Sequence, residues 1–431
     1  MMKAEMLDCQ NQGTGLLPGD WRLSKLSDIA DINPGRTKPE SEDDEVSFLA
    51  MGDVSEEGRV IGRQTRNYQD VAKGFTSFVE NDVLVAKITP CFENGKGALA
   101  TNLLGGIGFG STEFHVIRAK EGDTLPSFLH FHTRDESFRK SGERNMVGSA
   151  GQKRVPADFL REYKIALPPI REQQKIVAIL TTVDDKLEVI ACQIEATHTL
   201  KRGLMQTLFS QGVGTQDADG RWVPHTNFKD SELGTTPTSW QILPQGDVAT
   251  FHNGRAYKLS EWEEDGTPVI RLQNLTGSGE KYYYSNLKLP AHQYVEKGEL
   301  LYMWSASFGP HIWSGDRAIY HYHIWKVECG EHLDQRFMYY SLATLTETMR
   351  GKMNGSTMAH LTKAGMEKQL MVVPSLSEQK RIAEILSSAD AKLDLLLARK
   401  ARVENLKRGL MQKLLTGEWR VKPEDAELLA A

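Results

Sequence analysis

The stretch PPIREQQKIVAILTTVDDKLEVIACQIEATHTLKRGLMQTLFS occupies residues 168–210, and the related stretch PSLSEQKRIAEILSSADAKLDLLLARKARVENLKRGLMQKLLT occupies residues 374–416. The two align without a gap. The pair Glu172-Gln173 matches Glu378-Gln379, and the heptapeptide LKRGLMQ begins at Leu200 and again at Leu406. The chain therefore contains an internal duplication, and the fold is expected to use one element twice.

Each copy is predicted to be one long helix. Apolar residues recur at steps of three and four, and an average step of 3.5 residues keeps them in a narrow stripe on one side of a helix. Prolines at the start of each copy suit the first turn of a helix. Ser375 and Glu378 have the spacing of a capping box, in which each side chain satisfies a backbone donor. We call the predicted stripe the seam; it comprises Ile176, Leu180, Leu187, Ile190, Leu204, Ile382, Leu386, Leu393, Leu396 and Leu410.

A helix with a single apolar stripe needs a partner that covers the stripe. The chain supplies two such helices, so the simplest prediction is that they pack on each other. A generic dimerisation coiled coil is the alternative, and the stripe alone does not separate the two. The rest of the chain favours the first, because it carries two related but divergent globular segments, one before the first helix and one between the helices.

Composition limits the class of protein. A chain of 431 residues predicts two or three domains with sizeable cores. The four cysteines are scattered without a paired motif, which indicates free thiols in a reducing compartment. The sequence lacks a signal-peptide pattern and a long apolar run, so we expect a cytoplasmic protein without a membrane segment. A net charge of −5 argues mildly against a free-standing nucleic-acid binder, which is usually basic.

The segments outside the helices are predicted to be globular. Short apolar runs, glycine-rich turns and few helices indicate α/β (α+β) domains with a mixed or antiparallel sheet. We expect a first domain over residues 1–167, helices over 168–210 and 374–416, a linker over 211–237, a second domain over 238–373 and a polar tail over 417–431.

The two globular segments share a skeleton. Trp21 corresponds to Trp240, and Gly35-Arg36 corresponds to Gly254-Arg255 at the same offset. Elsewhere the segments diverge, whereas the helices agree closely. Closely similar helices combined with divergent globular segments suit a molecule that recognises two different targets at a fixed separation.

Taken together, the proline-plus-EQxxI helix openings and the duplicated LKRGLMQ resemble the specificity subunit of type I restriction-modification systems. The resemblance covers nearly the whole chain, including the segment FKDSELGTTPTSW that leads into the second domain at Phe228–Trp240. It implies two target recognition domains that alternate with the repeated helices in a pseudo-twofold tandem repeat. It implies that the helices pair as an antiparallel coiled coil, and that the chain reads a bipartite, asymmetric target in double-stranded DNA. The implied partners are two methyltransferase subunits and two restriction (translocase) subunits.

No catalytic constellation is evident in the sequence. Asn33-Pro34-Gly35 is not the NPPY or NPPF motif of adenine methyltransferases, and the phosphate-binding motif GxxxxGK[ST] does not occur. His311, His321 and His323 lack a carboxylate or cysteine at ligand spacing, so we expect no metal site. S-adenosylmethionine, ATP and Mg²⁺ are expected only in the partner subunits.

Candidate DNA contacts lie in polar loops with basic and amide side chains, because such side chains read base edges and bind phosphates. Each loop taken singly is also compatible with an ordinary solvated turn. The Tyr282–Tyr284 run and Trp304, Trp313 and Trp325 are assigned to sheet and core packing. The candidates in the first domain are Asn33, Arg36, Lys38, Arg63, Gln64, Arg66, Asn67, Tyr68, Ser149, Gln152, Lys153 and Arg154. Those in the second domain are Asn253, Arg255, Tyr257, Lys258, Arg271, Gln273, Asn274, Lys281, Asn354, Ser356 and Thr357.

Gly203 and Gly409 occupy the same place in the two copies of LKRGLMQ. A glycine inside a helix costs about 1 kcal/mol relative to alanine. Close approach of another backbone, from the other helix or from a methyltransferase subunit, is our hypothesis for both. Two other functions stay open at this point: an interaction scaffold without a DNA role, and a stand-alone DNA methyltransferase, against which the missing motifs weigh.

Overall fold

The computed structural model describes residues 17–149, 151–279, 281–305, 307–352 and 362–421. The chain divides into two compact units. The first unit comprises residues 1–191 and 399–431, and the second comprises residues 192–398. Each unit therefore contains one globular domain, the beginning of one long helix and the end of the other.

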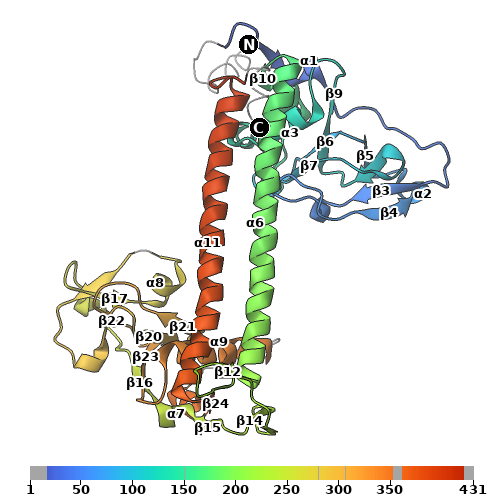
Figure 1. Ribbon diagram of the computed structural model, residues 1–431. Helices are drawn as coiled ribbons and strands as arrows, with labels where there is room; N and C mark the ends of the chain where they lie inside the picture. The colour runs from blue at the N-terminus through green and yellow to red at the C-terminus, as the bar shows by residue number, and fades with distance from the viewer. Residues whose placement is uncertain (1–16, 150, 280, 306, 353–361, 422–431) are drawn as a thin grey trace. The chain divides into compact units, whose positions relative to one another are not determined.

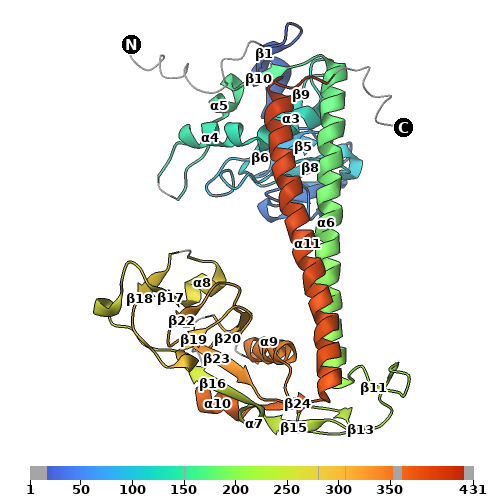
Figure 2. The ribbon, with the colours of Figure 1, turned by 60° about the vertical axis from the view of Figure 1, so that its left-hand side comes forward.

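The two predicted long helices are confirmed as α6 (Ile170–Ser210) and α11 (Leu376–Leu415). In both units the start of one helix lies beside the end of the other, so the helices run antiparallel (Figures 1 and 2). The core of the first unit joins Ile176 and Leu180 to Met411, Leu414 and Leu415. The core of the second unit joins Ile382, Ala383 and Leu386 to Met205 and Leu208.

The seam is buried at most of its predicted positions. Leu187, Leu204 and Leu410 are instead half-buried. Near the start of each helix the globular domain also covers the seam, and Ile176, Leu180, Ile382 and Leu386 are fully enclosed there. The buried seam residues are Ile176, Leu180, Ile190, Ile382, Leu386, Leu393 and Leu396.

Two ion pairs join the helices, and the duplication relates them. Lys201 contacts Asp390 at 2.5 Å in the second unit, and Lys407 contacts Asp184 in the first. Asp184 corresponds to Asp390, and Lys201 corresponds to Lys407, in the gap-free alignment of the two copies. In both pairs the residue numbers add to the same total, so both pairs fix one antiparallel register.

A buried glutamate anchors the start of each helix to its domain. Glu172 accepts a hydrogen bond from Trp21 Nε1 at 2.9 Å, and Glu378 accepts one from Trp240 Nε1 at 2.8 Å. Arg420 binds both oxygens of Glu172 at 2.8 Å. The segment that follows α11 therefore returns to the start of α6, so the predicted polar tail is held at least as far as its fifth residue.

The equivalent glutamate in the second unit has different partners. Glu378 accepts hydrogen bonds from His225 Nε2 at 3.0 Å and from the backbone N–H of Gly214 at 3.1 Å. Of the predicted capping box, only the bond from the Glu378 N–H to Ser375 Oγ forms, at 3.4 Å. The carboxylate does not reach back to the helix start because Trp240, His225 and Gly214 occupy it.

The glutamine next to each glutamate ties the helix to a loop of its domain. Gln173 accepts from the Leu125 N–H at 2.9 Å and donates to the Pro168 carbonyl at 2.9 Å. Gln379 accepts from the Asp334 N–H at 2.8 Å and donates to the Pro374 carbonyl at 2.9 Å. Both side chains are fully buried, so these bonds satisfy groups that water cannot reach. The duplicated Glu-Gln pair is thus a structural joint.

The first domain contains two four-stranded sheets and one two-stranded sheet. One sheet has the order β2-β9-β6-β7, the other has the order β4-β3-β8-β5 with β3 and β8 parallel, and β1 pairs with β10. The strands are β1 (Arg22–Lys25), β2 (Ala30–Ile32), β3 (Glu45–Leu49), β4 (Gln64–Asn67), β5 (Thr76–Val79), β6 (Val83–Ala86), β7 (Gly97–Leu99), β8 (Ile107–Gly110), β9 (Phe114–Ala119) and β10 (Lys164–Leu167). The helices are α1 (Leu26–Ile29), α2 (Tyr68–Val71), α3 (Pro126–Arg134), α4 (Glu136–Arg144) and α5 (Ala157–Glu162).

The second domain repeats this topology strand for strand. Its sheets have the orders β16-β23-β20-β21 and β18-β17-β22-β19, with β17 and β22 parallel, and β15 pairs with β24. The strands are β15 (Gln241–Pro244), β16 (Ala249–Asn253), β17 (Thr267–Ile270), β18 (Tyr283–Ser285), β19 (Tyr294–Val295), β20 (Leu300–Met303), β21 (Gly309–Ile312), β22 (Ala318–Tyr320), β23 (Ile324–Cys329) and β24 (Leu370–Val373). The helices are α7 (Gln245–Val248), α8 (Leu272–Thr276), α9 (Gln335–Lys352) and α10 (Lys363–Glu367).

The segment predicted as a linker is structured. It forms two small hairpins, in which β11 (Thr215–Gln216) pairs with β12 (Trp222–Val223) and β13 (Phe228–Lys229) pairs with β14 (Thr236–Pro237). Its glycines and aspartates mark the turns of these hairpins, which is why its composition resembled a flexible connection.

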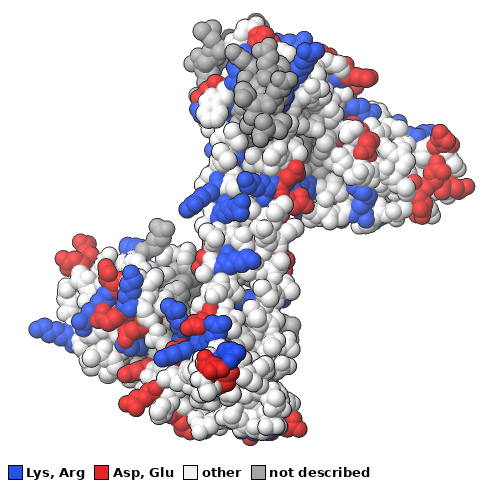
Figure 3. All heavy atoms as spheres, viewed as in Figure 1, with Lys and Arg blue, Asp and Glu red and all other residues white. Residues whose placement is uncertain are grey.

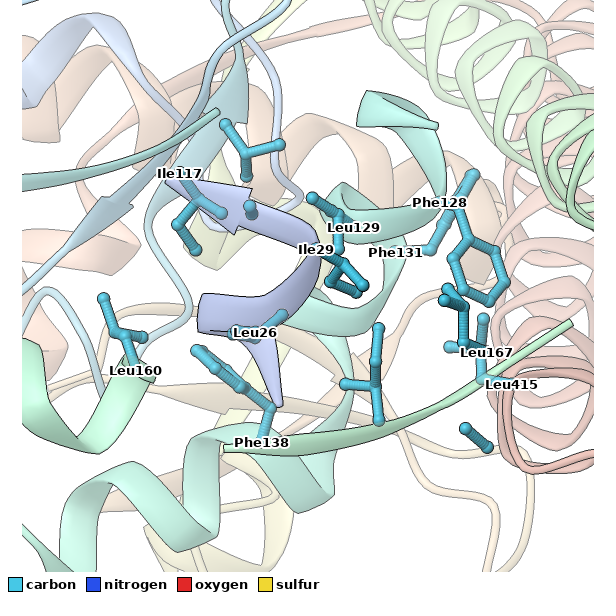
Figure 4. Packing of buried hydrophobic residues seen from close by; sticks show 14 of the residues in the cluster. Leu26, Ile29, Ile117, Phe128, Leu129, Phe131, Phe138, Leu160, Leu167 and Leu415 are labelled. Atoms are coloured by element: carbon cyan, nitrogen blue, oxygen red, sulfur yellow. The ribbon is translucent and has the colours of Figure 1, made fainter. Parts of the chain in front are cut away.

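A continuous apolar strand separates two cores in each domain. In β6, Val83 and Val85 face the core that includes the long helices, and Leu84 faces the core between the sheets. Alternate side chains of a strand point to opposite faces, so both faces of this strand are covered. Figure 4 shows the first of these cores, where Phe128 of α3 lies near Leu167 of β10 and Leu415 of α11. Among the described residues, no helix is long and apolar enough to span a membrane.

Loss of the Asp184 carboxylate should destabilise the first unit. Its side chain is 13% exposed and also pairs with Arg134 at 2.7 Å, so Asp184→Asn leaves two enclosed cations without an anion. Burial alone would raise the pKa of Asp184, but Arg134 and Lys407 outweigh it and hold the pKa below its usual range. We expect a loss of about 3–5 kcal/mol in unfolding free energy at pH 7, measured by denaturant titration. The wild-type contribution should itself fade as the pH falls through the lowered pKa.

The matched control is Asp390→Asn, at the equivalent position in the second copy. Asp390 and Lys201 are more exposed, at 30% and 23%, so this change should cost about 1 kcal/mol or less. If both variants lost the same unfolding free energy, burial would not determine the contribution of these two ion pairs.

Candidate nucleic-acid interface

In the first domain a buried histidine joins two of the predicted loops. His115 Nδ1 lies 3.0 Å from Asn33 Nδ2, and His115 Nε2 lies 2.8 Å from the carbonyl oxygen of Val155. Asn33 Oδ1 also accepts from the Val116 N–H at 3.0 Å. Burial lowers the pKa of His115, so the ring is neutral at pH 7. The loop that begins at Asn33 and the loop that ends at Arg154 therefore lie side by side.

Several predicted contacts in this domain have structural partners within the chain. Arg154 binds both oxygens of Glu113, at 2.8 and 2.9 Å, and this ion pair holds the second loop. Arg36 donates to the Phe75 carbonyl at 2.9 Å, and Arg63 donates to the Thr101 carbonyl at 2.7 Å. These arginines keep free donors, but their positions are set by the fold.

Two further candidates are part of the hydrophobic packing. Tyr68 is buried and lies against Phe109 with ring centroids 5.6 Å apart. The Arg66 guanidinium lies 3.7 Å from the centroid of the Phe48 ring. A buried tyrosine cannot touch DNA, so the structure gives Tyr68 a core role in place of the predicted contact. The exposed candidates of the first domain are Asn33, Arg36, Lys38, Arg63, Gln64, Asn67, Ser149, Gln152 and Lys153.

The loop that carries Lys38 continues directly into the acidic run Glu40–Glu45. Figure 3 shows acidic side chains gathered at the tip of the first domain, over β3, β4 and the loop that precedes them. Phosphate groups would be repelled there. The loop over residues 148–154, which lacks acidic residues, is therefore the better candidate for a phosphate contact in this domain.

In the second domain three predicted loops converge on aromatic rings. The Arg255 guanidinium lies 4.9 Å from the Tyr257 ring centroid, and the Arg271 guanidinium lies 5.3 Å from that of Tyr283. Trp262 bridges the two groups, at 5.4 Å from Tyr257 and 4.5 Å from Tyr283. Such stacking restricts both guanidinium groups. Arg255 also forms an ion pair with Glu261 at 2.5 Å, whereas Arg271 keeps its charge free of a salt bridge within the described residues.

The remaining candidates of this domain divide by role. Asn274 Oδ1 accepts from the Arg271 N–H at 2.9 Å, and its Nδ2 donates to the Gly279 and Lys281 carbonyls at 3.2 Å. Asn274 thus holds the loop, while Asn253, Lys258 and Lys281 are exposed and Gln273 is half-buried. The predicted contacts at Asn354, Ser356 and Thr357 lie outside the described residues.

A tight turn between β22 and β23 joins this group, although it was not among the predicted loops. It consists of His321, Tyr322 and His323. The His321 ring stacks on Tyr257 at 6.5 Å, and the Tyr322 ring lies 3.9 Å from that of His323. Trp304, which was assigned to packing, donates from Nε1 to the Tyr322 carbonyl at 2.8 Å. The run of three consecutive ring side chains was the available signal in the sequence, where His321 and His323 were considered only as possible metal ligands.

Both histidines of the turn are neutral at pH 7. Burial, assisted by His323 and Arg271, lowers the pKa of His321 to about 4. Burial and Arg271 also lower the pKa of His323. No group of three or more side chains that could hold a metal ion occurs among the described residues.

Three buried polar atoms of this group have no hydrogen-bond partner among the described residues. They are Arg255 Nη1, Tyr257 Oη and His323 Nδ1. An unpaired buried donor or acceptor is costly, and binding sites are places where such atoms persist. The second domain therefore carries a concentrated candidate site, whereas candidates in the first domain are dispersed over loops.

The first unit also has a groove of about 450 Å³ between α4 and α11. Figure 3 shows basic side chains gathered over the part of α11 that belongs to this unit. The lining is of mixed charge, with six basic and four acidic residues. The basic ones are Arg134, Arg139, Lys140, Arg144, Lys407 and Arg408, and the acidic ones are Glu56, Asp135, Glu136 and Glu404.

The duplicated heptapeptide presents the same exposed face on both helices. Leu200 is 55% exposed and its counterpart Leu406 is 56% exposed. A Cβ added to Gly203 or Gly409 would meet no atom within 4 Å in the described chain. The part of our hypothesis that invoked the other helix is therefore wrong, because neither glycine lies in the seam. Packing within this chain does not require the exposed residues of the two heptapeptides to be the same.

The fold and its surfaces define a class of protein: a tandem repeat of two mixed α/β domains, each joined by a Glu-Gln pair to one of two antiparallel helices. Within that class, the family model described as the type I restriction modification DNA specificity domain matches residues 18–197 and 237–405. These ranges cover most of the sequence. The chain belongs to this family.

Known relatives are similar over different lengths. The chain is 35% identical over 259 residues to the EcoAI specificity subunit of Escherichia coli, covering 59% of this chain and 44% of that protein. It therefore spans less than half the length of that relative. It is 25% identical over 428 residues to the MjaVIII specificity subunit of Methanocaldococcus jannaschii, covering 94% of both. The S subunit structure from M. genitalium has a similar fold, with a TM-score of 0.56, 16% identity, and coverage of 94% of this chain and 98% of that one.

The neutral state of His321 can be tested directly. Imidazole NMR titration should show His321 uncharged down to about pH 4 to 5, because burial opposes protonation. Arg271→Met removes a nearby positive charge and should raise the pKa of both His321 and His323. A titration of His321 near pH 6.5, the ordinary value, would mean that the turn is solvated and not packed in this group.

Proposed function

We propose that this chain is the DNA-recognition and assembly subunit of a type I restriction-modification complex. Each globular domain recognises one half of a bipartite, asymmetric duplex target, and the helix pair carries docking surfaces for methyltransferase subunits. Restriction subunits join through that assembly. The chain itself performs no catalysis, and its partners supply S-adenosylmethionine, ATP and Mg²⁺ chemistry.

One observation carries this proposal: two domains of identical topology have dissimilar candidate faces in a chain of the specificity family. The first face is formed by polar loops around His115 and Arg154, and the second by cations on aromatic rings around Tyr257. Equal scaffolds with unlike surfaces suit an asymmetric target. A homotypic scaffold without a DNA role would not require this difference.

The net charge of −5 bears on how DNA is bound. Phosphate neutralisation by a few loops gives weak binding that falls with salt, and a basic partner surface would complete the footprint. We therefore expect the chain with its methyltransferase partner to bind duplex DNA more tightly than the chain alone.

The decisive experiment is a methylome of cells that express the chain with its presumed methyltransferase. We expect methylation at a bipartite motif. Exchange of residues 21–165 for the corresponding domain of another family member should change one half of the motif and preserve the other, because the two domains fold around separate cores. A change in both halves would contradict independent reading. If the affinity for duplex DNA did not fall as the salt concentration rises, the chain would make no phosphate contacts. That result would favour an interaction scaffold without a DNA role.

Docking of two identical partners should depend on the duplicated heptapeptide. The double variant Leu200→Asp, Leu406→Asp places charge on both equivalent exposed faces and should weaken methyltransferase co-purification about tenfold or more while leaving the fold intact. Leu395→Asp is the control, because Leu395 is 69% exposed on α11 outside the heptapeptide. Equal behaviour of the double variant and the control would place docking elsewhere.

A further inference from the structure

The turn His321-Tyr322-His323 has no equivalent chemistry in the first domain. The corresponding turn, between β8 and β9, consists of Ser111, Thr112 and Glu113. Because the two domains share one topology, a small polar turn is sufficient for the fold at this place. The aromatic character of the turn in the second domain therefore needs another explanation.

Tyr322 is exposed, yet it is rigidly supported. Tyr322 is 40% exposed. The centroid of its ring lies 4.4 Å from that of His321 and 3.9 Å from that of His323. Trp304 holds the turn by its bond to the Tyr322 carbonyl and lies 5.4 Å from the His323 ring. An exposed aromatic side chain contributes little to the stability of the fold. Here its position is nevertheless fixed by contacts with the neighbouring rings and by the Trp304 hydrogen bond.

The support continues into the hydrophobic core. Trp304 stacks on Trp325 at 5.7 Å with an interplanar angle of 16°, and Trp325 stacks on Tyr302 at 5.9 Å with an angle of 13°. Trp325 and Tyr302 are buried. A series of stacked aromatic rings thus connects the surface turn to the hydrophobic core. This packing fixes the orientation of the turn before any ligand binds.

The surroundings of the tip suit a nucleic acid better than a hydrophobic partner. Arg255 and Arg271 flank it on stacked rings, and Arg255 is held there by its ion pair with Glu261. Arg255 Nη1, Tyr257 Oη and His323 Nδ1 are buried polar atoms that have no hydrogen-bond partner within the part of the chain that the structure describes. Arginine pairs with base edges and phosphates, and exposed rings contact base faces or thymine methyl groups. Polar atoms that lack partners beside an exposed ring match a ligand that offers both donors and a flat apolar surface.

We propose that the His321-Tyr322-His323 turn is the base-contacting tip of the second domain, with the Tyr322 ring against the bases of one half-site and Arg255 and Arg271 beside it. This proposal rests on the proposed function and assigns the specificity of one half of the target to a particular element. Tyr322 determines specificity, and Trp304 is a positioning residue that acts through the turn.

The test uses the full chain with its methyltransferase partner. The half-site that survives exchange of residues 21–165 belongs to the second domain. Tyr322→Ala should reduce or relax methylation at that half-site and weaken binding to the target duplex about tenfold, while the other half-site is unchanged. Tyr322→Phe keeps the ring and should retain most of both activities.

Phe228→Ala provides the matched control, because Phe228 is another exposed aromatic residue of the same unit, at 41%, and lies outside the group. It should leave both half-sites unchanged. Trp304→Leu should resemble Tyr322→Ala in specificity, with its folding checked by circular dichroism.

The outcomes separate the two proposals. Absence of any bipartite motif with the wild-type chain would overturn the proposed function. A wild-type motif that Tyr322→Ala leaves intact would overturn only the assignment of the turn. Loss of methyltransferase co-purification with Tyr322→Ala, at unchanged DNA affinity of the chain, would make the turn a protein contact and also overturn that assignment.

Discussion

The antiparallel pairing of two copies of one helix is the constraint on which the rest of the fold depends. Each copy contains an aspartate and, seventeen residues later, a lysine. Because the copies align without a gap and run antiparallel, the aspartate of each copy pairs with the lysine of the other, which gives two equivalent ion pairs. Polar pairs within an otherwise apolar seam select one register and exclude others, since any shift would leave enclosed charges unpaired. The seam itself, with leucines and isoleucines at many positions, would tolerate several registers.

The Glu-Gln pair converts this helix pairing into a joint with the domains. Each glutamate receives the indole N–H of a tryptophan at the start of its domain, and each glutamine satisfies a loop of the same domain. The segment after one helix then returns to the start of the other, through Arg420 in the first unit and Gly214 in the second. The same joint is therefore built from different auxiliary residues, which explains why the glutamate and glutamine recur while their neighbours vary.

Within each unit the conserved topology leaves the loops free to differ. One central strand in each domain separates the core that packs against the helices from a core between the sheets, so changes in a surface loop do not disturb the packing against the helices. The first domain uses this freedom for polar loops braced by a neutral histidine. The second uses it for cations on aromatic rings and for a rigid aromatic turn. A family member with such domains can acquire unlike recognition surfaces on one scaffold.

The duplication, the two long helices and the two related domains followed from the sequence by itself, because heptad spacing and gap-free repetition are local signals that depend only on residue order. The polar loops around Arg255 and Arg271 could also be found in this way. Tertiary structure alone decided that Tyr68 and Asn274 serve the fold, that residues 211–237 form hairpins, and that Trp304 supports an exposed turn. A side chain has the same chemistry in a core, a brace or a binding face. Only the neighbours that distant segments bring to it determine which role it has.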